Sequence, residues 1–418
     1  MYDIFSLKNY KMPDGFLWGS GYAGHQVEGN NVNSNRWYNE ENGKTLERSG
    51  LACNSYEMYE DDIDLVDMLG HKAFRTSVEW SRIEPEEGVF CEEALEHYVK
   101  LFSKLKERGV KVFATMVHLC HPLWFSKLGD FRQTENLKYF ERYLEYTVPR
   151  IAPYVDFWNV LNESNMTGVE SKLGALHFHA LGYHIIKKYS SAPVSSAHAL
   201  VQYVPQRYHD RWDRSMTEIK DLENNEYFFH AIRTGEIVFP YKNAIWAPEI
   251  KGTTDYWAVN SYVRSMIDAR KEKLNGKRYD CKELKMIDMD FYLEEMDPEC
   301  LIANTTRLMD KPIYITENGC SCDDDRFRIV FIALYLSAVA EAIKMGVDIR
   351  GYLYWSLLDN YEWTSFKPRF GLCDCDRITF KRTPKPSAEF YREIIQNNGF
   401  DSTTLRKYLL EMPSLSRH

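Results

Sequence analysis

The chain has 418 residues, 44% of them hydrophobic and 27% charged, which is the composition of a globular protein and excludes a disordered or fibrous one. Its formal net charge of −9, with no concentrated run of Lys and Arg, argues against a nucleic-acid partner. Because no stretch of about 18 apolar residues occurs and the first residues lack a signal-peptide core, we expect no membrane span and a cytoplasmic protein.

Eight short apolar segments alternate with segments of helical spacing along the chain. The apolar segments predict strands near residues 16–26, 71–79, 110–118, 155–163, 193–200, 254–262, 312–317 and 349–356. Helical spacing is clearest over residues 56–70, 93–109, 137–151 and 327–346, and three of these segments end in glycine. Strands that are apolar throughout and separated by amphipathic helices favour a parallel sheet covered on both faces. Eight such units favour a closed (β/α)8 TIM barrel, and the absence of a linker predicts one catalytic domain over residues 1–418.

Polar side chains stand where most of the predicted strands end. They are Gln26, Arg75, His118, Asn162 with Glu163, Asn260 with Tyr262, and Glu317 with Asn318. A polar residue often simply ends a strand, but here the pattern recurs on six strands. The carboxyl ends of barrel strands converge on one face, where (β/α)8 enzymes build their active sites. We therefore expect these side chains to form one site.

The cysteines and histidines do not predict a metal site. The pairs Cys320/Cys322 and Cys373/Cys375 are separated by one residue, whereas zinc ligands are usually spaced by two or more. Nine cysteines are also too sparse for a disulfide scaffold, so we expect reduced thiols. We expect no metal and no cofactor.

Two of the strand ends carry the carboxyl groups that glycoside hydrolysis needs. Glu163 follows FWNVLN, and Glu317 stands in the corresponding place in PIYITENG. If both face the barrel axis, their carboxyl groups can approach to roughly 5–5.5 Å, the separation of a retaining glycosidase. An ionised Glu317 raises the pKa of Glu163 and keeps it an acid. Arg75 is either the cation that keeps Glu317 ionised or a structural ion-pair partner at the rim.

At these residues the chain resembles glycoside hydrolase family 1, the β-glucosidase and β-galactosidase family. The matching segments are 15–19, 25–29, 74–85, 158–163, 314–319, 354–363, 369–372 and 382–391, in family order. The resemblance implies that Glu163 is the acid/base and Glu317 the nucleophile. It implies sugar-binding roles for Gln26, His118, Asn162, Glu362, Trp355 and Trp363, and nucleophile-orienting roles for Arg75, Tyr262 and Asn260. Core packing for the two Trp, and a solvated loop position for Glu362, are the alternatives.

The same resemblance indicates an unphosphorylated substrate. Members that act on 6-phospho sugars have Ser at the position of Glu362 and a Lys and Tyr shortly after, where this chain has Pro368 and Phe370. The chain also departs from the usual family pattern. Ser164 replaces a Pro, Leu119 replaces a Trp that donates to the sugar, and Ala199 or His198 replaces an Asn. These departures leave glycone selectivity open among glucose, galactose and fucose.

We therefore predict a retaining β-glycosidase whose partner is a small β-glycoside or short oligosaccharide. A transglycosylase that uses the same covalent intermediate remains an alternative, as does a catalytically idle carbohydrate-binding protein of the same fold. A thioglycosidase is disfavoured because such an enzyme typically lacks the acid, which Glu163 supplies here. The sequence leaves a homo-oligomer open.

Overall fold

Eight parallel strands close into the predicted barrel. The structure is a computed structural model that describes residues 7–270 and 296–410. The barrel strands, in chain order, are β2 (Leu17–Gly21), β3 (Ala73–Ser77), β4 (Lys111–Val117), β5 (Phe157–Asn162), β6 (Val194–Ala199), β10 (Trp257–Asn260), β12 (Ile313–Asn318) and β13 (Ile349–Trp355). Each strand pairs in parallel with the next, and β13 returns to β2. The predicted (β/α)8 fold and all eight predicted strands are confirmed.

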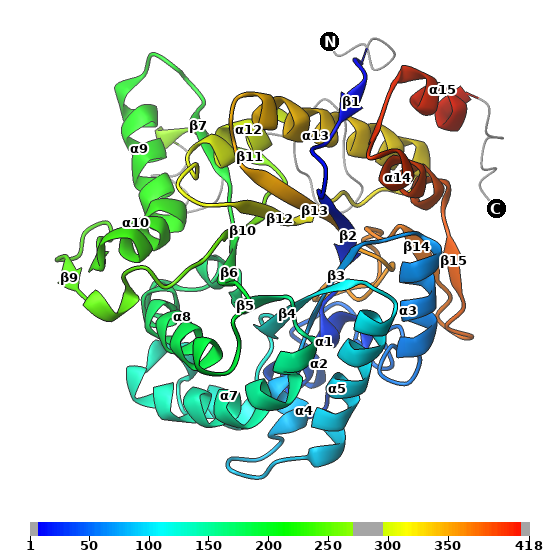
Figure 1. Cartoon of the computed structure of the whole chain (residues 1–418). Coiled ribbons are helices and arrows are strands. Elements are labelled where there is room, and N and C mark those ends of the chain that lie inside the picture. The colour runs from blue at the N-terminus through cyan, green and yellow to red at the C-terminus, as the bar shows by residue number, and fades with distance from the viewer. Residues whose placement is uncertain (1–6, 271–295, 411–418) are drawn as a thin grey trace.

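Helices surround the strands as an outer ring (Figure 1). Those that match the predicted helical segments are α3 (Tyr59–Met68), α5 (Glu92–Glu107), α7 (Leu137–Ile151) and α13 (Asp325–Lys344). Gly70 and Gly109 follow α3 and α5 with φ of +72° each, the left-handed conformation in which glycine commonly ends a helix. The ring also includes α8 (Val169–Tyr189), α10 (Tyr227–Thr234), α12 (Glu299–Thr306) and α14 (Pro386–Asn397).

Shorter elements decorate the barrel. The short helices that precede the site or lie near it are α1 (Gly24–Val27), α2 (Asn35–Glu41), α4 (Trp80–Ile83) and α6 (Leu123–Lys127), with α9 (Arg211–Asp221) and α15 (Ser402–Leu410) further along the chain. The two-stranded pairs are β1 (Tyr10–Lys11) with β16 (Gly399–Phe400), β7 (Gln202–Pro205) with β11 (Arg264–Ile267), β8 (Glu236–Ile237) with β9 (Ile245–Trp246), and β14 (Cys373–Cys375) with β15 (Arg382–Pro384). The β1–β16 pair brings both ends of the described chain together.

Aromatic rings fill one end of the barrel interior and leave the other end to polar groups. Phe113 stacks on Phe157 with ring centroids 4.2 Å apart, and Tyr314 packs against Phe157 at 4.8 Å. Small residues such as Ala73 and Ala258 complete this buried cluster. The rings exclude water beneath the strand ends, so charged groups placed above them lie on an apolar floor.

A glycine allows the seventh and eighth barrel strands to approach closely at the site. A Cβ atom on Gly319, just after β12, would lie 1.8 Å from the carbonyl oxygen of Trp355 at the end of β13. Only glycine tolerates such a backbone approach. The contact fixes the end of the strand that carries Glu317 against the strand that carries Trp355.

Within residues 7–270 and 296–410, the helices lack the combination of length and apolar character that crossing a membrane requires.

A buried ion pair ties the C-terminal part of the chain to α3. Arg382 Nε donates to Asp62 Oδ1 at 2.8 Å, and both side chains are at least nine-tenths buried. Removing one partner of a buried pair leaves an uncompensated charge, which costs more than the pair contributes. The pair therefore locks β15 and α14 onto the first half of the barrel.

We expect Arg382→Met to lower the free energy of unfolding by about 3–5 kcal/mol at pH 7, because it strands the Asp62 carboxylate in the interior. Chemical denaturation monitored by tryptophan fluorescence measures the change. Arg108→Met is the matched control, since Arg108 pairs with Asp64 at 2.7 Å on the exposed surface. Its loss should cost less than about 1 kcal/mol. Equal effects of the two substitutions would contradict this account.

Candidate active site

A cavity of about 230 Å3 opens at the carboxyl ends of the barrel strands. Eight of the eleven side chains that the sequence singled out line it: His118, Glu163, Asn260, Tyr262, Glu317, Trp355, Glu362 and Trp363. The other three, Gln26, Arg75 and Asn162, are buried behind this lining and contact it or its neighbours. The structure thus brings the residues from six strand ends and the 356–363 loop to one place.

Glu163 lies directly after β5 in a left-handed conformation, with φ of +47° and ψ of +39°. Such a conformation is uncommon for a residue with a side chain and often marks a functional position. Its main-chain N–H donates to the carbonyl of Ala197 at 2.8 Å, which anchors the turn to β6. Asn260 Nδ2 donates to the carboxyl Oε1 at 2.9 Å. The main chain of Glu163 is therefore held by β6, and its carboxyl group is held by Asn260 of β10.

Burial and a neighbouring acid keep Glu163 protonated. Burial, together with the charge of Glu317, raises the pKa of Glu163 to about 8, although the Asn260 hydrogen bond lowers it in part. The group is thus mainly neutral at pH 7 and can donate a proton.

Glu317 receives the positively charged donor of the site. Arg75 Nη1 forms a short ion pair with Glu317 Oε1, and Tyr262 donates its hydroxyl to Oε2 at 2.9 Å. Burial raises the pKa of Glu317, while Arg75 and then Tyr262 lower it. Glu163 accepts from the neutral amide of Asn260, whereas Glu317 accepts from a cation. This asymmetry favours the charge on Glu317 and the proton on Glu163.

A hydrogen-bond network fixes the tautomer of His118. Arg75 Nη2 and Asn260 Nδ2 both donate to Asn162 Oδ1, so the Asn162 amide nitrogen must face His118 Nε2, which is 3.0 Å away. Burial, with the nearby charge of Arg75, lowers the pKa of His118 well below its usual value. The ring is therefore neutral, accepts at Nε2 and carries its proton on Nδ1. Among the described residues, that Nδ1 atom is buried and lacks a hydrogen-bond partner.

Gln26 offers a second buried polar atom of the same kind. Its Nε2 donates to Asn360 Oδ1 at 3.1 Å, which orients the amide. Its Oε1 is buried and has no hydrogen-bond partner in the described part of the chain. Leaving buried polar atoms unpaired is costly unless a ligand completes them. Gln26 and His118 thus provide one acceptor and one donor that a polyhydroxylated ligand can satisfy.

Aromatic rings and a third carboxyl group form the remaining wall. His118 stacks on Trp355 and Trp363 with ring centroids 5.6 and 5.8 Å apart. Trp355 Nε1 donates to Glu362 Oε1 at 3.3 Å. Burial raises the pKa of Glu362 to about 8, and the indole hydrogen bond lowers it in part. Glu362 is buried in the cavity wall and is not the solvated loop acid that the sequence left as an alternative.

The structure shows which of Ala199 and His198 takes the place of the Asn that is usual on the fifth barrel strand. It also shows a role for Thr316, which the sequence did not indicate. Ala199 lines the cavity, whereas His198 lies outside the lining and donates from Nε2 to the carbonyl of Asn224 at 2.9 Å. Thr316 donates its hydroxyl to Asn260 Oδ1 at 2.7 Å and so aims the Asn260 amide at Glu163. A β-branched residue in a strand is ordinary, so no sequence signal indicated this role.

In the described ranges, no cluster of three or more His, Cys, Asp and Glu side chains has the arrangement of a metal site. Two buried carboxyl groups of unequal basicity at the mouth of a (β/α)8 barrel define the class of carboxylate-based glycoside hydrolases.

Comparison with known proteins narrows this class. A family model described as glycosyl hydrolase family 1 matches residues 8–210 and 174–400. The β-galactosidase of Pyrococcus woesei is 26% identical over 93% of this chain and 97% of its own length. Beta-glucosidase A of Thermotoga maritima is 25% identical over 94% of this chain and 99% of its length. The 6-phospho-β-galactosidase of Staphylococcus epidermidis is 25% identical over 93% and 98%.

Solved structures agree with the sequence relatives. A β-glycosidase from Pyrococcus horikoshii superposes with a TM-score of 0.87 at 32% identity, covering 98% of this chain and 100% of that one. The chain belongs to glycosyl hydrolase family 1, and it is a β-glycosidase.

We expect Glu317→Gln to lower the pKa of Glu163 from about 8, because the substitution removes the negative charge that disfavours ionisation of Glu163. Glu163 then loses its proton at a lower pH than in the unsubstituted protein. Infrared or carboxyl 13C NMR difference titration measures the shift, with Glu163→Gln identifying the signal. Glu107→Gln, an exposed change at the end of α5, should leave the titration unaltered. An unchanged Glu163 midpoint in Glu317→Gln would show that the two carboxyl groups are not coupled.

Proposed function

We propose that the protein hydrolyses unphosphorylated β-glycosides with retention of configuration, with Glu317 as nucleophile and Glu163 as acid/base. The observation that carries the proposal is the unequal environment of the two carboxyl groups. Glu317 holds the Arg75 cation, and Glu163 has its pKa raised to about 8. A retaining glycosidase needs one carboxylate and one carboxylic acid in the same site.

In the first step, Glu317 attacks the anomeric carbon while Glu163 gives its proton to the departing glycosidic oxygen. Tyr262 and Arg75 hold the two oxygens of Glu317 on the side of the cavity where the sugar must lie. The carbon–oxygen bond to the leaving group breaks, and an ester bond between the sugar and Glu317 forms.

In the second step, Glu163 acts as base. Esterification removes the charge of Glu317, so the repulsion that raised the pKa of Glu163 disappears. Glu163, now ionised, takes a proton from water, and the resulting hydroxide equivalent displaces Glu317 from the anomeric carbon. The acid/base regains its proton and the nucleophile its charge.

The wall of the cavity suits an uncharged sugar ring. His118 Nδ1–H and Gln26 Oε1 offer a donor and an acceptor to ring hydroxyls, and the indoles of Trp355 and Trp363 provide flat apolar faces. We propose a β-glucoside as the preferred substrate, with a β-galactoside or β-fucoside as alternatives. Nitrophenyl β-glycosides of these sugars rank them directly.

The charges of the lining argue against a phosphorylated sugar. Three carboxyl groups, those of Glu163, Glu317 and Glu362, line the cavity, and its lining contains neither Lys nor Arg. A sugar phosphate carries close to two negative charges at neutral pH and gains most from Arg or Lys donors.

We expect 4-nitrophenyl β-glucoside to have a kcat/KM at least about 100-fold above that of its 6-phosphate, since two like charges in a buried site cost several kcal/mol. Glu362→Ser should raise the relative rate of the 6-phosphate because it removes a carboxyl group that, with a pKa of about 8, adds a further negative charge beside the phosphate whenever it ionises. Steady-state kinetics on both substrates tests this. A preference for the 6-phosphate in the unsubstituted enzyme would contradict the proposed substrate class.

We expect Glu317→Gln to abolish turnover of every β-glycoside, and Glu163→Ala to slow poor leaving groups far more than activated aryl ones. The reason is that a nitrophenolate leaves without a proton, whereas an alkoxide needs one from Glu163. Azide should partly restore Glu163→Ala turnover and give the β-glycosyl azide. Proton NMR of the first-formed sugar checks retention. An α-configured first product, or equal loss for both leaving groups, would refute the assigned roles.

A further inference from the structure

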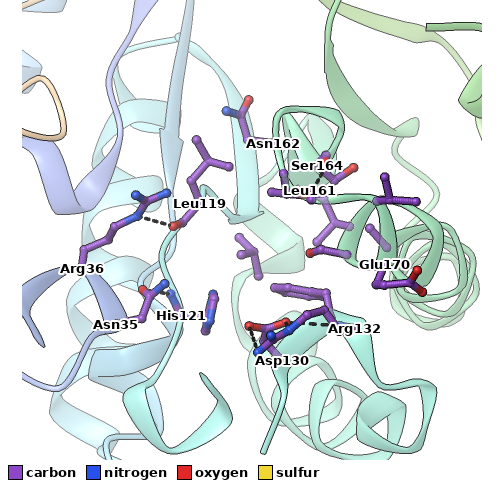
Figure 2. Close-up of a pocket in the computed structure, with 17 residues that line it drawn as sticks. Asn35, Arg36, Leu119, His121, Asp130, Arg132, Leu161, Asn162, Ser164 and Glu170 are labelled. Atoms are coloured by element: carbon purple, nitrogen blue, oxygen red, sulfur yellow. Dashed lines mark hydrogen bonds and ion pairs between the residues drawn. The ribbon is translucent and has the colours of Figure 1, made fainter. Parts of the chain in front are cut away.

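A second and larger cavity, of about 540 Å3, lies beside the active site (Figure 2). The two cavities are lined by successive residues of the same strand ends. His118 lines the active site and Leu119 the side cavity, and Glu163 is followed by Ser164 in the same way. Because these lining residues are consecutive in the chain, the two cavities adjoin at Leu119 and Ser164. A ligand that extends beyond the active site therefore meets the side cavity at once.

The residues that make room for this cavity are two of the departures from the family pattern. Leu119, with φ of +56°, stands where the family resemblance places a bulkier indole, and Ser164 stands where it places a proline. Both line the cavity, across from one another in Figure 2. Its floor is apolar and includes Val117, Phe131 and Leu161. The side cavity is thus lined by two of the residues at which this chain departs from the family pattern, and it lies beyond the residues assigned to hydrolysis.

Arg36 of α2 supplies the uncompensated charge of this cavity. Its Nε donates to the carbonyl of Leu119 at 2.8 Å, and its guanidinium lies 4.8 Å from the ring centroid of Trp363. Among the described residues, none of the ion pairs includes Arg36. The nearby Glu40 is occupied, because its two oxygens accept from His25 and Ser49.

The other charges that line the cavity are already paired. Arg132 contacts Asp130 at 3.0 Å, and Glu170 contacts Lys242 at 3.1 Å. Arg36 is partly buried, and this burial lowers the pKa of its guanidinium, so water compensates its charge only in part. A poorly solvated cation without a counter-charge is stabilised by a bound anion, and an apolar floor strengthens that attraction.

We propose that the side cavity is a leaving-group subsite that takes an anionic group, a carboxylate or a sulfate, and that Arg36 binds it. The proposal rests on the glycosidase function proposed above. The leaving group is assigned because the acid must touch the glycosidic oxygen, and the chain that lines this cavity, from Ser164 to Ser171, begins at the residue after Glu163. The three carboxyl groups that line the active site disfavour an anion there. Arg36 can bind the anion in the side cavity because its guanidinium is not already in an ion pair among the described residues.

The experiment compares two aryl β-glucosides that differ in charge and hardly in shape, 3-carboxyphenyl and 3-carbamoylphenyl β-glucoside. The quantity measured is the ratio of their kcat/KM values in each enzyme, which cancels any general effect of a substitution on the glucose site. We expect Arg36→Gln to lower the carboxylate-to-amide ratio about tenfold, the factor that an ordinary charge-assisted hydrogen bond supplies. Arg36→Lys should retain most of the ratio because it keeps the charge.

Arg48→Gln is the matched control, because it makes the same change of net charge at an exposed residue that pairs with Glu41 at 3.0 Å, outside the cavity lining. Its ratio should equal that of the unsubstituted enzyme. The preference for the carboxylate should also fall as salt is raised, since the cavity is open to solvent. An Arg36→Gln ratio equal to that of the control would overturn the subsite.

The outcomes separate this subsite from the function on which it rests. Absence of turnover of both glucosides by the unsubstituted enzyme would refute the proposed glycosidase function. Turnover of both with an Arg36-independent ratio would refute the subsite alone. The alternative is that the anionic group belongs to the sugar ring. Comparing the kcat/KM values of 4-nitrophenyl β-glucuronide and 4-nitrophenyl β-glucoside tests it. If Arg36→Gln changes that ratio and leaves the aryl ratio intact, the anion is carried by the sugar and the leaving-group assignment is wrong.

Discussion

Arg75 is fully buried at the centre of the site, and its guanidinium reaches Glu317 with one nitrogen and Asn162 with another. A buried carboxylate without a cation would simply take up a proton, because desolvation penalises its charge. The same cation helps to keep His118 neutral, so that its ring can accept from Asn162 and still carry a proton on Nδ1. One side chain thus sets the ionisation of the proposed nucleophile, Glu317, and the tautomer of His118, which we propose binds the sugar.

The barrel explains why residues so distant in sequence share this cation. Arg75 lies in the middle of β3, Asn162 ends β5 and Glu317 is the next-to-last residue of β12. The carboxyl ends of parallel barrel strands meet on one face. This geometry made the site predictable, because a polar residue after each apolar run is visible in the sequence. The strands themselves were predictable for the same reason: they are apolar throughout and bounded by polar residues. The position of Gln26 behind the lining still follows from packing that the pattern does not contain.

Other features depend on contacts that no local pattern records. The left-handed turn at Glu163 is imposed by its link to Ala197 on the next strand, since a glutamate has no intrinsic preference for that conformation. The Asp62–Arg382 pair joins residues 320 positions apart, and each looks like an ordinary surface charge in its own segment. The sequence did not predict the side cavity. It showed only that Leu119 and Ser164 depart from the family pattern. Its volume and the position of its cation, Arg36, depend on the packing of helix α2 beside the end of β4, which the sequence pattern does not contain.

The distribution of charge around the site decides what kind of substrate each part can hold. Glu163, Glu317 and Glu362 share one small apolar enclosure, and mutual repulsion and burial raise the pKa of Glu163 and of Glu362 to about 8. Any anion that entered there would raise these pKa values further, so the enclosure favours a neutral sugar. A negative charge is better placed in the side cavity lined by Leu119 and Ser164, where Arg36 donates to the Leu119 carbonyl. The proposed specificity for a neutral sugar and the proposed affinity for an anionic leaving group therefore follow from the same uneven placement of charge between two adjoining cavities.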